Sequence, residues 1–481
     1  MSSDIAVTAS GPAGTGAVAA GSPATCEAAA QMLRLGGTAV DAIVAGAFAA
    51  TMAEPTLASL GGGGFCLVAT PGGHIRVIDF FVNMPGIDGT SATAQPMDNL
   101  CVTFGSGVQQ EFHAGWSSVA TPGTLAGLLY LHAAGGRLPL ADVVAPAAAM
   151  AHEGLMLDPV QVEFIRVIGP ILTLTPASAA LFTPPLEGMP FRNPAYADML
   201  VRLGAGESAE DAFARPVAEA IKAHHGLVSL TDFTEYAVVE RTPVWARRGD
   251  AWIWSNPPPA FGGAIVLESL GLVAATDPWT AVPGALRAAT ERHRVHDQPQ
   301  VRRGTTHLTA VDGDGRIAAL SLSNGSGSGT VAAGVALNNM LGEADLHPGG
   351  FHSLRPGQRL SSMMAPTLAV RDDGSLLALG TGGSERIRSA LVQVLVRALD
   401  IGEPLVEAIA APRLHVGDDL IDIEPGFPDD YVAGLRGATS VRTWPSPDLY
   451  FGGVHAVTRD PEGRVTAVAD TRRGGAVAVV D

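Results

Sequence analysis

Lysine is almost absent from this 481-residue sequence: Lys222 is the only one, and the other basic residues are arginines. The segment AIKAHH places Lys222 on a predicted helix surface, so we expect neither a Schiff-base lysine nor a G-x-x-x-x-G-K-[ST] phosphate loop. The net charge is −17 and no basic stripe is visible. This balance excludes nucleic acid and anionic membrane surfaces as expected partners and leaves small molecules.

Cysteine is also scarce. Cys26, Cys66 and Cys101 are too few and too scattered for a disulfide framework or a zinc site. The first 33 residues contain no basic residue and no apolar run of the kind found in signal peptides. The longest charge-free stretch, residues 112–136, is interrupted by proline, glycine and serine, so no transmembrane helix is predicted. We therefore expect a cytoplasmic location.

What the sequence does contain is typical of a tightly packed enzyme. Hydrophobic residues make up 47% of the chain and there are 58 glycines, enough for one large domain or two to three ordinary ones. Helical patterns are predicted at 22–35, 38–54 and through much of 123–222. Strands are predicted around 65–82 and 236–255 and, after residue 305, as hairpins about DGDG and DDGS. This order predicts an α+β fold with layers of antiparallel sheet.

The segment GTTHLTAV, which opens the DGDG hairpin, is a candidate site. A threonine at a chain N-terminus combines a nucleophilic hydroxyl with an α-amine whose pKa is about 8, so it can act as its own base. Exposing Thr305 in this way requires cutting the peptide bond after Gly304, and a residue without Cβ tolerates the strained backbone of that reaction. The alternative is structural, because Gly-Thr-Thr also suits the entrance of a strand.

Acyl transfer also needs donors for a developing negative charge. The turn Gly380-Thr381-Gly382-Gly383 lies between a predicted strand and a predicted helix, with Ser384 as the expected helix cap. Its backbone N–H groups could form an oxyanion hole, although a strand-to-helix turn can need glycines for geometry alone. The run Gly61–Gly64 is equally consistent with a close-packing loop.

Taken in order, the motifs resemble those of the gamma-glutamyltranspeptidase family (glutathione hydrolases), whose members use an N-terminal nucleophile. About ten blocks occur in the family's order and cover most of the chain. They include LRLGGTAVDAIVA, AEPTLASLGGGGF, TPGTLAGLLYLHAAGG, WSNPPPAFGG, GTTHLTAVDGDGR, GVALNNML, LSSMMAPTLAV, GTGGSERI, APRLH and ADTRRGG.

The resemblance implies a four-layer αββα sandwich and a precursor that cuts itself between Gly304 and Thr305. The products would be a large subunit, 1–304, and a small subunit, 305–481, interleaved in one body and possibly paired as a homodimer. No metal or organic cofactor is implied, and the partner is a small amide substrate.

The resemblance also assigns roles to individual residues. Thr305 is the nucleophile, and Gly382 and Gly383 match the oxyanion-hole glycines. Two serines match the pair that binds the donor's α-carboxylate, and two further residues are candidates for the hydroxyl position that supports the nucleophile. These are Ser361 and Ser362 for the pair, and Ser323 or Asn324 for the supporting position.

Three departures from the family pattern bear on the substrate, and one of them is a much shorter stretch between PPPAFGG and TTH. Phe81 stands where the family has the arginine that clamps the glutamyl α-carboxylate, and Glu343 stands where an aspartate holds its α-amine. Losing a bidentate guanidinium removes charge-assisted hydrogen bonds of about 1.5–3 kcal/mol each. Arg76, Arg386 or Arg388 could substitute for the clamp. The prediction is therefore a γ-glutamyl amide hydrolase or acyltransferase, with a same-superfamily acylase for a small amide acid or a β-lactam side chain as the alternative.

Other classes of protein fit less well. A nucleotide-binding protein would need a lysine or a G-x-G-x-x-G helix opening at its glycine loops, and a serine hydrolase would need a G-x-S-x-G elbow, where this chain has glycine at position 327. His307 and His415 have no carboxylate at motif spacing, so both are predicted to be structural. Arg413, in APRLH, is predicted to join the two subunits.

Overall fold

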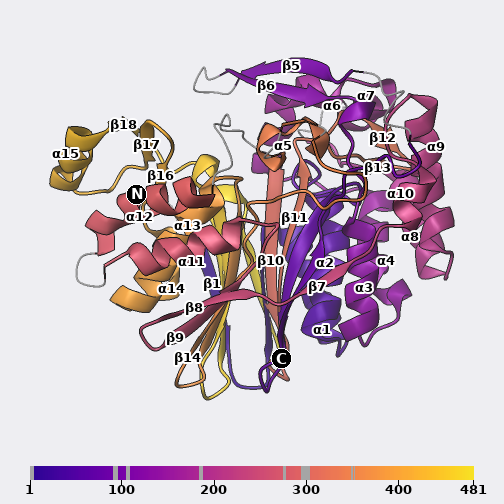
Figure 1. Ribbon diagram of the computed structural model, residues 1–481. Helices are drawn as coiled ribbons and strands as arrows, with labels where there is room; N and C mark the ends of the chain where they lie inside the picture. The colour runs from indigo at the N-terminus through magenta and orange to yellow at the C-terminus, as the bar shows by residue number, and fades with distance from the viewer. Residues whose placement is uncertain are drawn as a thin grey trace.

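The computed structural model describes residues 5–89, 96–103, 109–183, 188–274, 278–293, 304–347, 350–351 and 353–481. Two seven-stranded antiparallel sheets stack face to face, and helices cover both outer faces, so the layers run helix, sheet, sheet, helix (Figure 1). The predicted α+β class and the αββα arrangement are confirmed.

The first sheet contains the candidate nucleophile on one of its middle strands. Its strands, in spatial order, are β21 (Ala476–Val480), β2 (Gly16–Ala20), β10 (Gly304–Val311), β11 (Ile317–Gly325), β3 (Gly63–Ala69), β4 (Ile75–Phe80) and β7 (Val239–Arg241). The hairpin between β10 and β11 turns at the predicted DGDG. Every residue of these two strands is buried, because helices cover one face of the sheet and the second sheet covers the other.

The second sheet has the same number of strands. In spatial order they are β1 (Ala6–Gly11), β20 (Val465–Asp470), β19 (Gly453–Arg459), β15 (Leu376–Gly382), β14 (Thr367–Arg371), β9 (Ala251–Ser255) and β8 (Val244–Arg248). Each sheet therefore combines strands from before and after residue 304. A cut at that point would leave two chains that share both sheets and one core.

Helices on the outer face of the first sheet begin with α1 (Pro23–Arg34) and α2 (Ala39–Ala53), which pack directly on β2, β10, β11 and β21. Thr38 caps α2 through a reciprocal pair of hydrogen bonds with Asp41. All but one residue of α2 are buried, and most are small, so the helix fits closely between the sheet and its neighbours. Those neighbours are α3 (Thr124–Gly135) and α4 (Leu140–Glu153); α8 (Pro194–Gly204) packs on α4, and α9 (Arg215–Ala223) lies further out in Figure 1.

The outer face of the second sheet is covered by α11 (Gly262–Leu272), α13 (Arg386–Leu395) and α14 (Leu405–Ala410), with α12 (Pro278–His293) packed on α11. Short elements gather at one end of the sheets (Figure 1). They are α5 (Pro159–Val167), α6 (Gly169–Leu172), α7 (Pro176–Phe182), β5 (Asp98–Thr103), β6 (Gln109–Ala114), β12 (Val331–Ala332) and β13 (Val335–Ala336). Other short helices and strands of the described residues are α10 (Leu230–Thr234), α15 (Asp429–Ala438), β16 (Leu414–Val416), β17 (Leu420–Ile423) and β18 (Ser440–Thr443).

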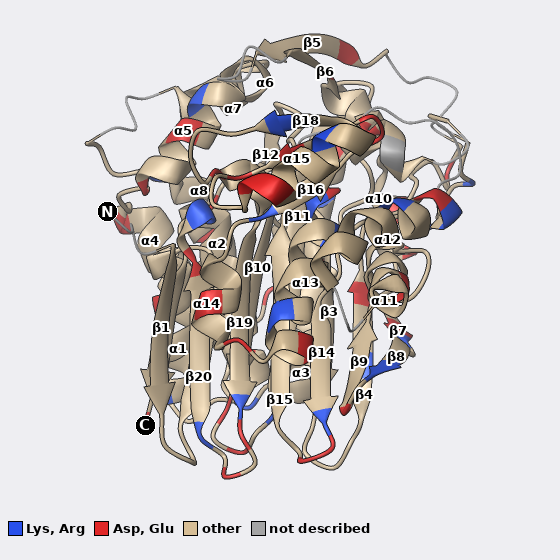
Figure 2. Cartoon of the chain, turned by 90° about the vertical axis from the view of Figure 1, so that its left-hand side faces the viewer, with Lys and Arg blue, Asp and Glu red and all other residues tan. Residues whose placement is uncertain are grey.

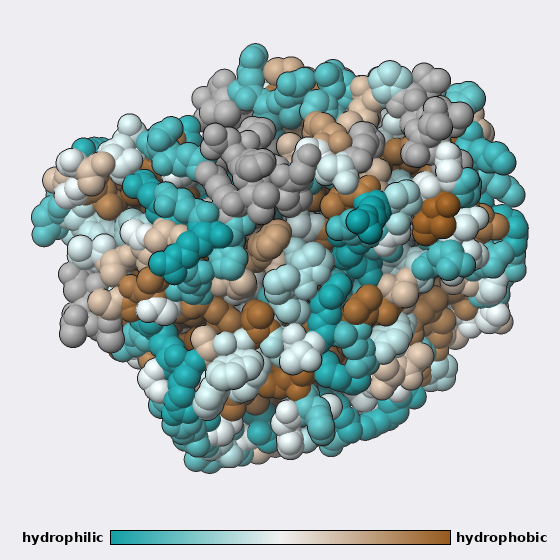
Figure 3. Space-filling model, in the orientation of Figure 1, coloured by the Kyte–Doolittle hydropathy of each residue, from teal (hydrophilic) through white to brown (hydrophobic). Residues whose placement is uncertain are grey.

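Charged side chains lie mainly on the periphery. The turns between β14 and β15 and between β19 and β20 carry several of them (Figure 2). On the face seen in Figure 3, apolar residues are scattered among polar ones. None of the helices in the described part of the chain is both long and apolar enough to span a bilayer.

Candidate active site

Thr305 lies at the start of β10 and is 3% exposed. It pairs with Ser323 on β11, and the register of the two strands shifts between Gly304 and Thr305. This irregularity falls at the peptide bond that the sequence predicts to be cut. A carbon added to Gly304 would collide with the carbonyl oxygen of Thr56, so only glycine fits there.

The hydroxyl of Ser323 donates a hydrogen bond of 2.7 Å to the carbonyl oxygen of Gly304. The backbone N–H of Gly325 donates to the same hydroxyl oxygen at 3.1 Å and fixes its direction. A donor at this carbonyl polarises the bond that Thr305 would attack. Of the two candidates for the position that supports the nucleophile, Ser323 and Asn324, this contact favours Ser323. Asn324 is the next residue on β11, and its side chain leaves on the opposite face of the strand.

The predicted oxyanion glycines lie at the end of β15, in the second sheet, which packs on β10. Gly382 ends β15 so close to Thr305 that a side chain there would collide with the carbonyl oxygen of Thr305. Gly383 follows with φ +127°, a conformation that favours glycine. The guanidinium of Arg473 lies beside both glycines and donates to the Thr305 carbonyl at 3.4 Å. Sequence reasoning missed Arg473, although it belongs to the quoted ADTRRGG block.

The predicted cap of the following helix is wrong. The N-cap of α13 is Glu385, and Ser384 has φ +55°, so its side chain is not placed to cap the first turn. Its hydroxyl is buried, with no hydrogen-bond partner among the described residues. An N-cap residue normally has an extended backbone, and the left-handed backbone of Ser384 departs from that conformation.

Glu54 is the second residue that sequence reasoning missed. Its side chain is fully buried, and its two carboxylate oxygens accept hydrogen bonds from Thr25, at 2.7 Å, and from Thr306. Burial raises the pKa of Glu54 to about 7 against the lowering effect of the two hydroxyl donors. A signal existed in the sequence, because Glu54 is the only acidic residue between Asp41 and Asp79.

Glu343, one of the predicted substrate residues, lies beside the strand partner of Gly304. A Cβ on Gly325, the residue paired with Gly304, would lie 2.6 Å from a carboxylate oxygen of Glu343. Ser361 donates to the carbonyl of Leu346 at 3.1 Å, and the Ser362 hydroxyl accepts the N–H of Met364 at 3.1 Å. Both serines are buried and take part in the backbone bonding around residues 346–364.

Phe81 packs in the hydrophobic core between the sheets and is 2% exposed. Its ring stacks on that of Phe65, with ring centroids 5.5 Å apart. Its carbonyl accepts hydrogen bonds from the hydroxyl of Tyr236, at 2.6 Å, and from Arg359. Phe81, which the sequence comparison places at the family's carboxylate clamp, is therefore an aromatic ring in an apolar environment.

The three arginines considered as substitutes for the clamp lie in different places. Arg76 forms an exposed ion pair with Glu240 at 2.9 Å. Arg388 is buried and donates to the carbonyl of Glu385 at 3.0 Å. Only Arg386 among the three lines a pocket that also contains Gly304.

That pocket, about 60 Å³ in volume, lies between β10, α5 and the turn around residue 449. Its apolar lining comes from Leu57, Phe164, Ile168, Leu449 and Tyr450, and its charged lining from Arg386, Arg473 and Asp448. The Arg386 guanidinium stacks on the Tyr450 ring at 4.8 Å. Burial, together with the neighbouring Arg386, lowers the pKa of Arg473 to about 9. Among the described residues that line the pocket, two cations stand against one carboxylate, which suits an anionic group.

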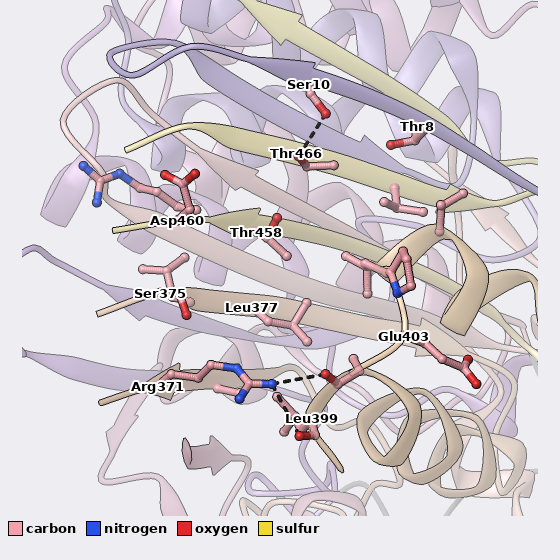
Figure 4. A pocket seen from close by; sticks show the side chains of 18 residues that line it. Thr8, Ser10, Arg371, Ser375, Leu377, Leu399, Glu403, Thr458, Asp460 and Thr466 are labelled. Carbon is pink, nitrogen blue, oxygen red and sulfur yellow. Dashed lines mark hydrogen bonds between the residues drawn. The ribbon is translucent and has the colours of Figure 1, made fainter. Parts of the chain in front are cut away.

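A larger cavity of about 500 Å³ lies elsewhere, on β1, β14, β15, β19 and β20 beside α14. Figure 4 shows its lining of hydroxyl and apolar side chains, with Arg371 hydrogen-bonded to the carbonyl of Leu399. None of the predicted site residues lines it. We therefore place the candidate active site at the smaller pocket beside Gly304.

The histidines lie where a structural role requires them. His307 is hydrogen-bonded to Ser321 and Thr309, at 2.9 and 2.8 Å, and His415 to Ser389 at 2.9 Å. Burial holds the pKa of both imidazoles well below the usual range, so both are neutral. No cluster of three or more His, Cys, Asp or Glu side chains suited to a metal ion occurs in the described residues.

The prediction for Arg413 is wrong. Its guanidinium pairs with Asp470 at 2.5 Å and donates to the carbonyls of Ile409 and Gly452. All three partners belong to residues 305–481, so Arg413 stabilises the predicted small subunit internally. Buried guanidinium groups need several acceptors, and the nearest carbonyls at this site come from the same part of the chain.

A threonine at the start of a middle strand, between two stacked antiparallel sheets and next to a glycine turn, is the arrangement of an amide hydrolase with an N-terminal nucleophile. The sequence matches the Gamma-glutamyltranspeptidase family over residues 25–289 and 280–480. The chain therefore belongs to the gamma-glutamyltranspeptidase family of self-processing amidases.

Individual relatives cover nearly the whole chain. The sequence is 29% identical to the Acylase ACY 1 proenzyme of Pseudomonas sp. (strain V22), over 96% of this chain and 92% of that one. It is 26% identical to the Glutathione hydrolase proenzyme of Escherichia coli (strain K12), over 92% and 88%. The cephalosporin acylase from Bacillus halodurans has the same fold, with a TM-score of 0.81, 24% identity and coverage of 98% and 96%.

Proposed function

We propose that the chain cuts itself between Gly304 and Thr305, and that the freed Thr305 hydrolyses an amide whose acyl group is not γ-glutamyl. The observation that carries the proposal is the geometry of the bond: buried Thr305 follows a carbonyl that accepts the hydroxyl hydrogen of Ser323 at 2.7 Å. The same strand start then supplies the nucleophile and base for substrate.

The reaction on substrate follows from these groups. The α-amine of Thr305 takes the proton of its own hydroxyl, and the oxygen attacks the amide carbonyl carbon. The backbone N–H groups of Gly382 and Gly383 would bind the resulting oxyanion. The amine product leaves with the proton, and water then hydrolyses the acyl ester and restores Thr305.

Support for a non-glutamyl acyl group comes from Phe81 and Arg386. The core position of Phe81 provides no cation for an α-carboxylate, whereas Arg386 and Arg473 provide two at the pocket beside Gly304. An acyl chain that ends in an acid would place that acid on Arg386. Two similar proteins are named acylases, which agrees with this choice. The γ-glutamyl group is the second candidate, favoured by the carboxylate of Glu343 beside Gly325, which suits an α-amine.

A set of three p-nitroanilides tests the acyl group: γ-glutamyl, 4-carboxybutanoyl, which lacks only the amino group, and butanoyl, which also lacks the acid. We expect the largest kcat/KM for 4-carboxybutanoyl. In Arg386→Gln this value should fall about tenfold or more while the butanoyl value stays unchanged, since one charge-assisted bond is lost. Arg76→Gln is the matched control, because Arg76 is exposed. A preference for γ-glutamyl that Arg386→Gln leaves intact would refute this acyl specificity.

A further inference from the structure

Residues 54–58 contact both neighbours of Thr305. The side chain of Glu54 accepts a hydrogen bond from the hydroxyl of Thr306. The carbonyl oxygen of Thr56 lies against the α-carbon of Gly304, where no side chain would fit. The segment therefore touches the residue before the nucleophile and the residue after it.

The segment is itself held firmly. The backbone N–H groups of Leu57 and Ala58 donate to the carbonyl of Glu54 at 2.9 and 3.0 Å and close a turn at the end of α2. The other carboxylate oxygen of Glu54 accepts from Thr25 on α1 at 2.7 Å. Glu54 thus connects two helices of the outer layer to the start of β10, and no part of its side chain is exposed.

We infer that Glu54 is a positioning residue for self-cleavage: by holding Thr306, it directs the hydroxyl of Thr305 toward the carbonyl carbon of Gly304. The inference rests on the proposed cut at this bond. In that step the Thr305 oxygen bonds to the Gly304 carbon, the carbon–nitrogen bond breaks, and the hydroxyl proton ends on the nitrogen. Water then opens the ester, which leaves a Gly304 carboxylate and a free Thr305.

The charge state of Glu54 matters to this role. An ionised carboxylate accepts both hydroxyl bonds, whereas a protonated one has an O–H that competes with them. The ionisable groups that face Glu54 are Asp158, at the start of α5, and Arg473, and they act in opposite directions. Burial has the largest effect and brings the pKa of Glu54 to about 7. Cleavage should therefore speed up as the pH rises through this value.

The test follows cleavage of precursor made by cell-free translation, with the products resolved on gels between about pH 6 and about pH 8. Thr306→Val removes only the donor to Glu54 and should slow cleavage by about tenfold or more, because small misplacements of reacting groups are costly. Glu54→Gln keeps a polar contact without a charge, so its residual rate should no longer depend on pH near 7. Glu240→Gln, on the surface, is the control.

The outcomes are separable. Wild-type rate and pH profile in both Glu54→Gln and Thr306→Val would overturn the inference. So would a slowed Glu54→Gln that keeps the wild-type profile, because that result would mean a merely structural role. Circular dichroism of each variant shows whether it has folded. If Glu54→Gln does not fold, the cleavage rate of Thr306→Val alone tests the inference. A wild-type precursor that stays whole, or is cut elsewhere, would instead refute the proposed function.

Discussion

At the residue scale, the hydrogen bond from Ser323 to the Gly304 carbonyl is the contact most directly related to self-cleavage. It resembles a donor of an oxyanion hole, placed on the bond that we propose the chain cuts. The hydrogen bonds that pair β10 with β11 are made by the backbone and do not involve the Ser323 side chain. The Ser323 hydroxyl can therefore donate to the Gly304 carbonyl without weakening the hairpin.

Ser323→Ala should slow self-cleavage by a factor on the order of 100, the usual effect of losing one oxyanion donor. Ser321→Ala is the matched control. Ser321 lies two residues earlier on the same face of β11 but bonds to His307. A time course of precursor loss on gels measures both rates. Equal rates in the two variants would show that the Ser323 contact does not assist cleavage.

Residue-scale prediction from the sequence had a physical limit. Gly304, Thr305 and the glycine turn could be named as candidates from residue types at local spacing, and the resemblance to the family then assigned their roles. Glu54 and Arg473 could not, because each acts through contacts across sheet and helix layers, Glu54 with Thr306 and Arg473 with Thr305. A lone buried acid after an apolar helix indicates a partner without saying which one.

At the element scale, the ends of β10 and β15 approach each other because glycine occupies the contact. Gly382→Ala would drive a methyl group into the carbonyl of Thr305. We expect a loss of about 1–3 kcal/mol of unfolding free energy, as for other overpacked cores, together with loss of activity. Urea unfolding measures the first effect.

Gly271→Ala is the control for this substitution. Gly271 lies in α11 with no atom near the position of its missing Cβ. Alanine is the better helix former, so this variant should match or slightly exceed the wild-type stability. Equal stability of the two variants would show that β10 and β15 do not depend on glycine at their closest point.

The elements themselves were largely predictable. The turns DGDG and DDGS fixed two hairpins, and the nearly all-apolar pattern of residues 39–53 indicated a buried helix. The start of α13 was predicted less well, since Ser384 has the residue type of a cap but not the backbone conformation. The left-handed backbone of Ser384 follows the positive φ of Gly383, and serine rarely adopts that conformation, so its residue type gives no local signal of it.

At the scale of the whole molecule, several buried histidines make folding sensitive to acid. Burial lowers the pKa of His455 to about 4, and those of His307 and His415 also fall. Between their ordinary pKa of about 6.5 and these lower values, the unfolded chain binds more protons than the folded one. Stability contributed by neutral histidine is therefore present above about pH 6.5 and is lost as the pH falls toward 4. Glu54 has the opposite effect on stability over part of this range, because its raised pKa makes the folded chain bind the extra proton.

The contribution of His455 can be isolated by comparing wild type with His455→Gln. Across the interval from about pH 6.5 to about pH 4, wild type should lose roughly 3 kcal/mol more than the variant, since each pKa unit corresponds to about 1.4 kcal/mol. Urea unfolding at a series of pH values measures the difference. Parallel curves would show that His455 already titrates normally in the folded protein.

The interleaving of both sheets also bears on cleavage. Both sheets combine strands from 1–304 with strands from 305–481 around one core, so the two products should stay together after the cut. Sequence similarity implied this arrangement through the order of its motif blocks. The physical reason appears only in the sheet order, where β10 and β11 lie between β2 and β3.

The most direct test of self-cleavage at Thr305 is the intact mass of the freshly purified protein beside its Thr305→Ala variant. Self-cleavage after Gly304 should give two species in the wild-type sample, one ending at Gly304 and one of 177 residues beginning at Thr305, and a single full-length chain in the variant. A single uncut mass in both samples, or a new terminus at another residue, would contradict it.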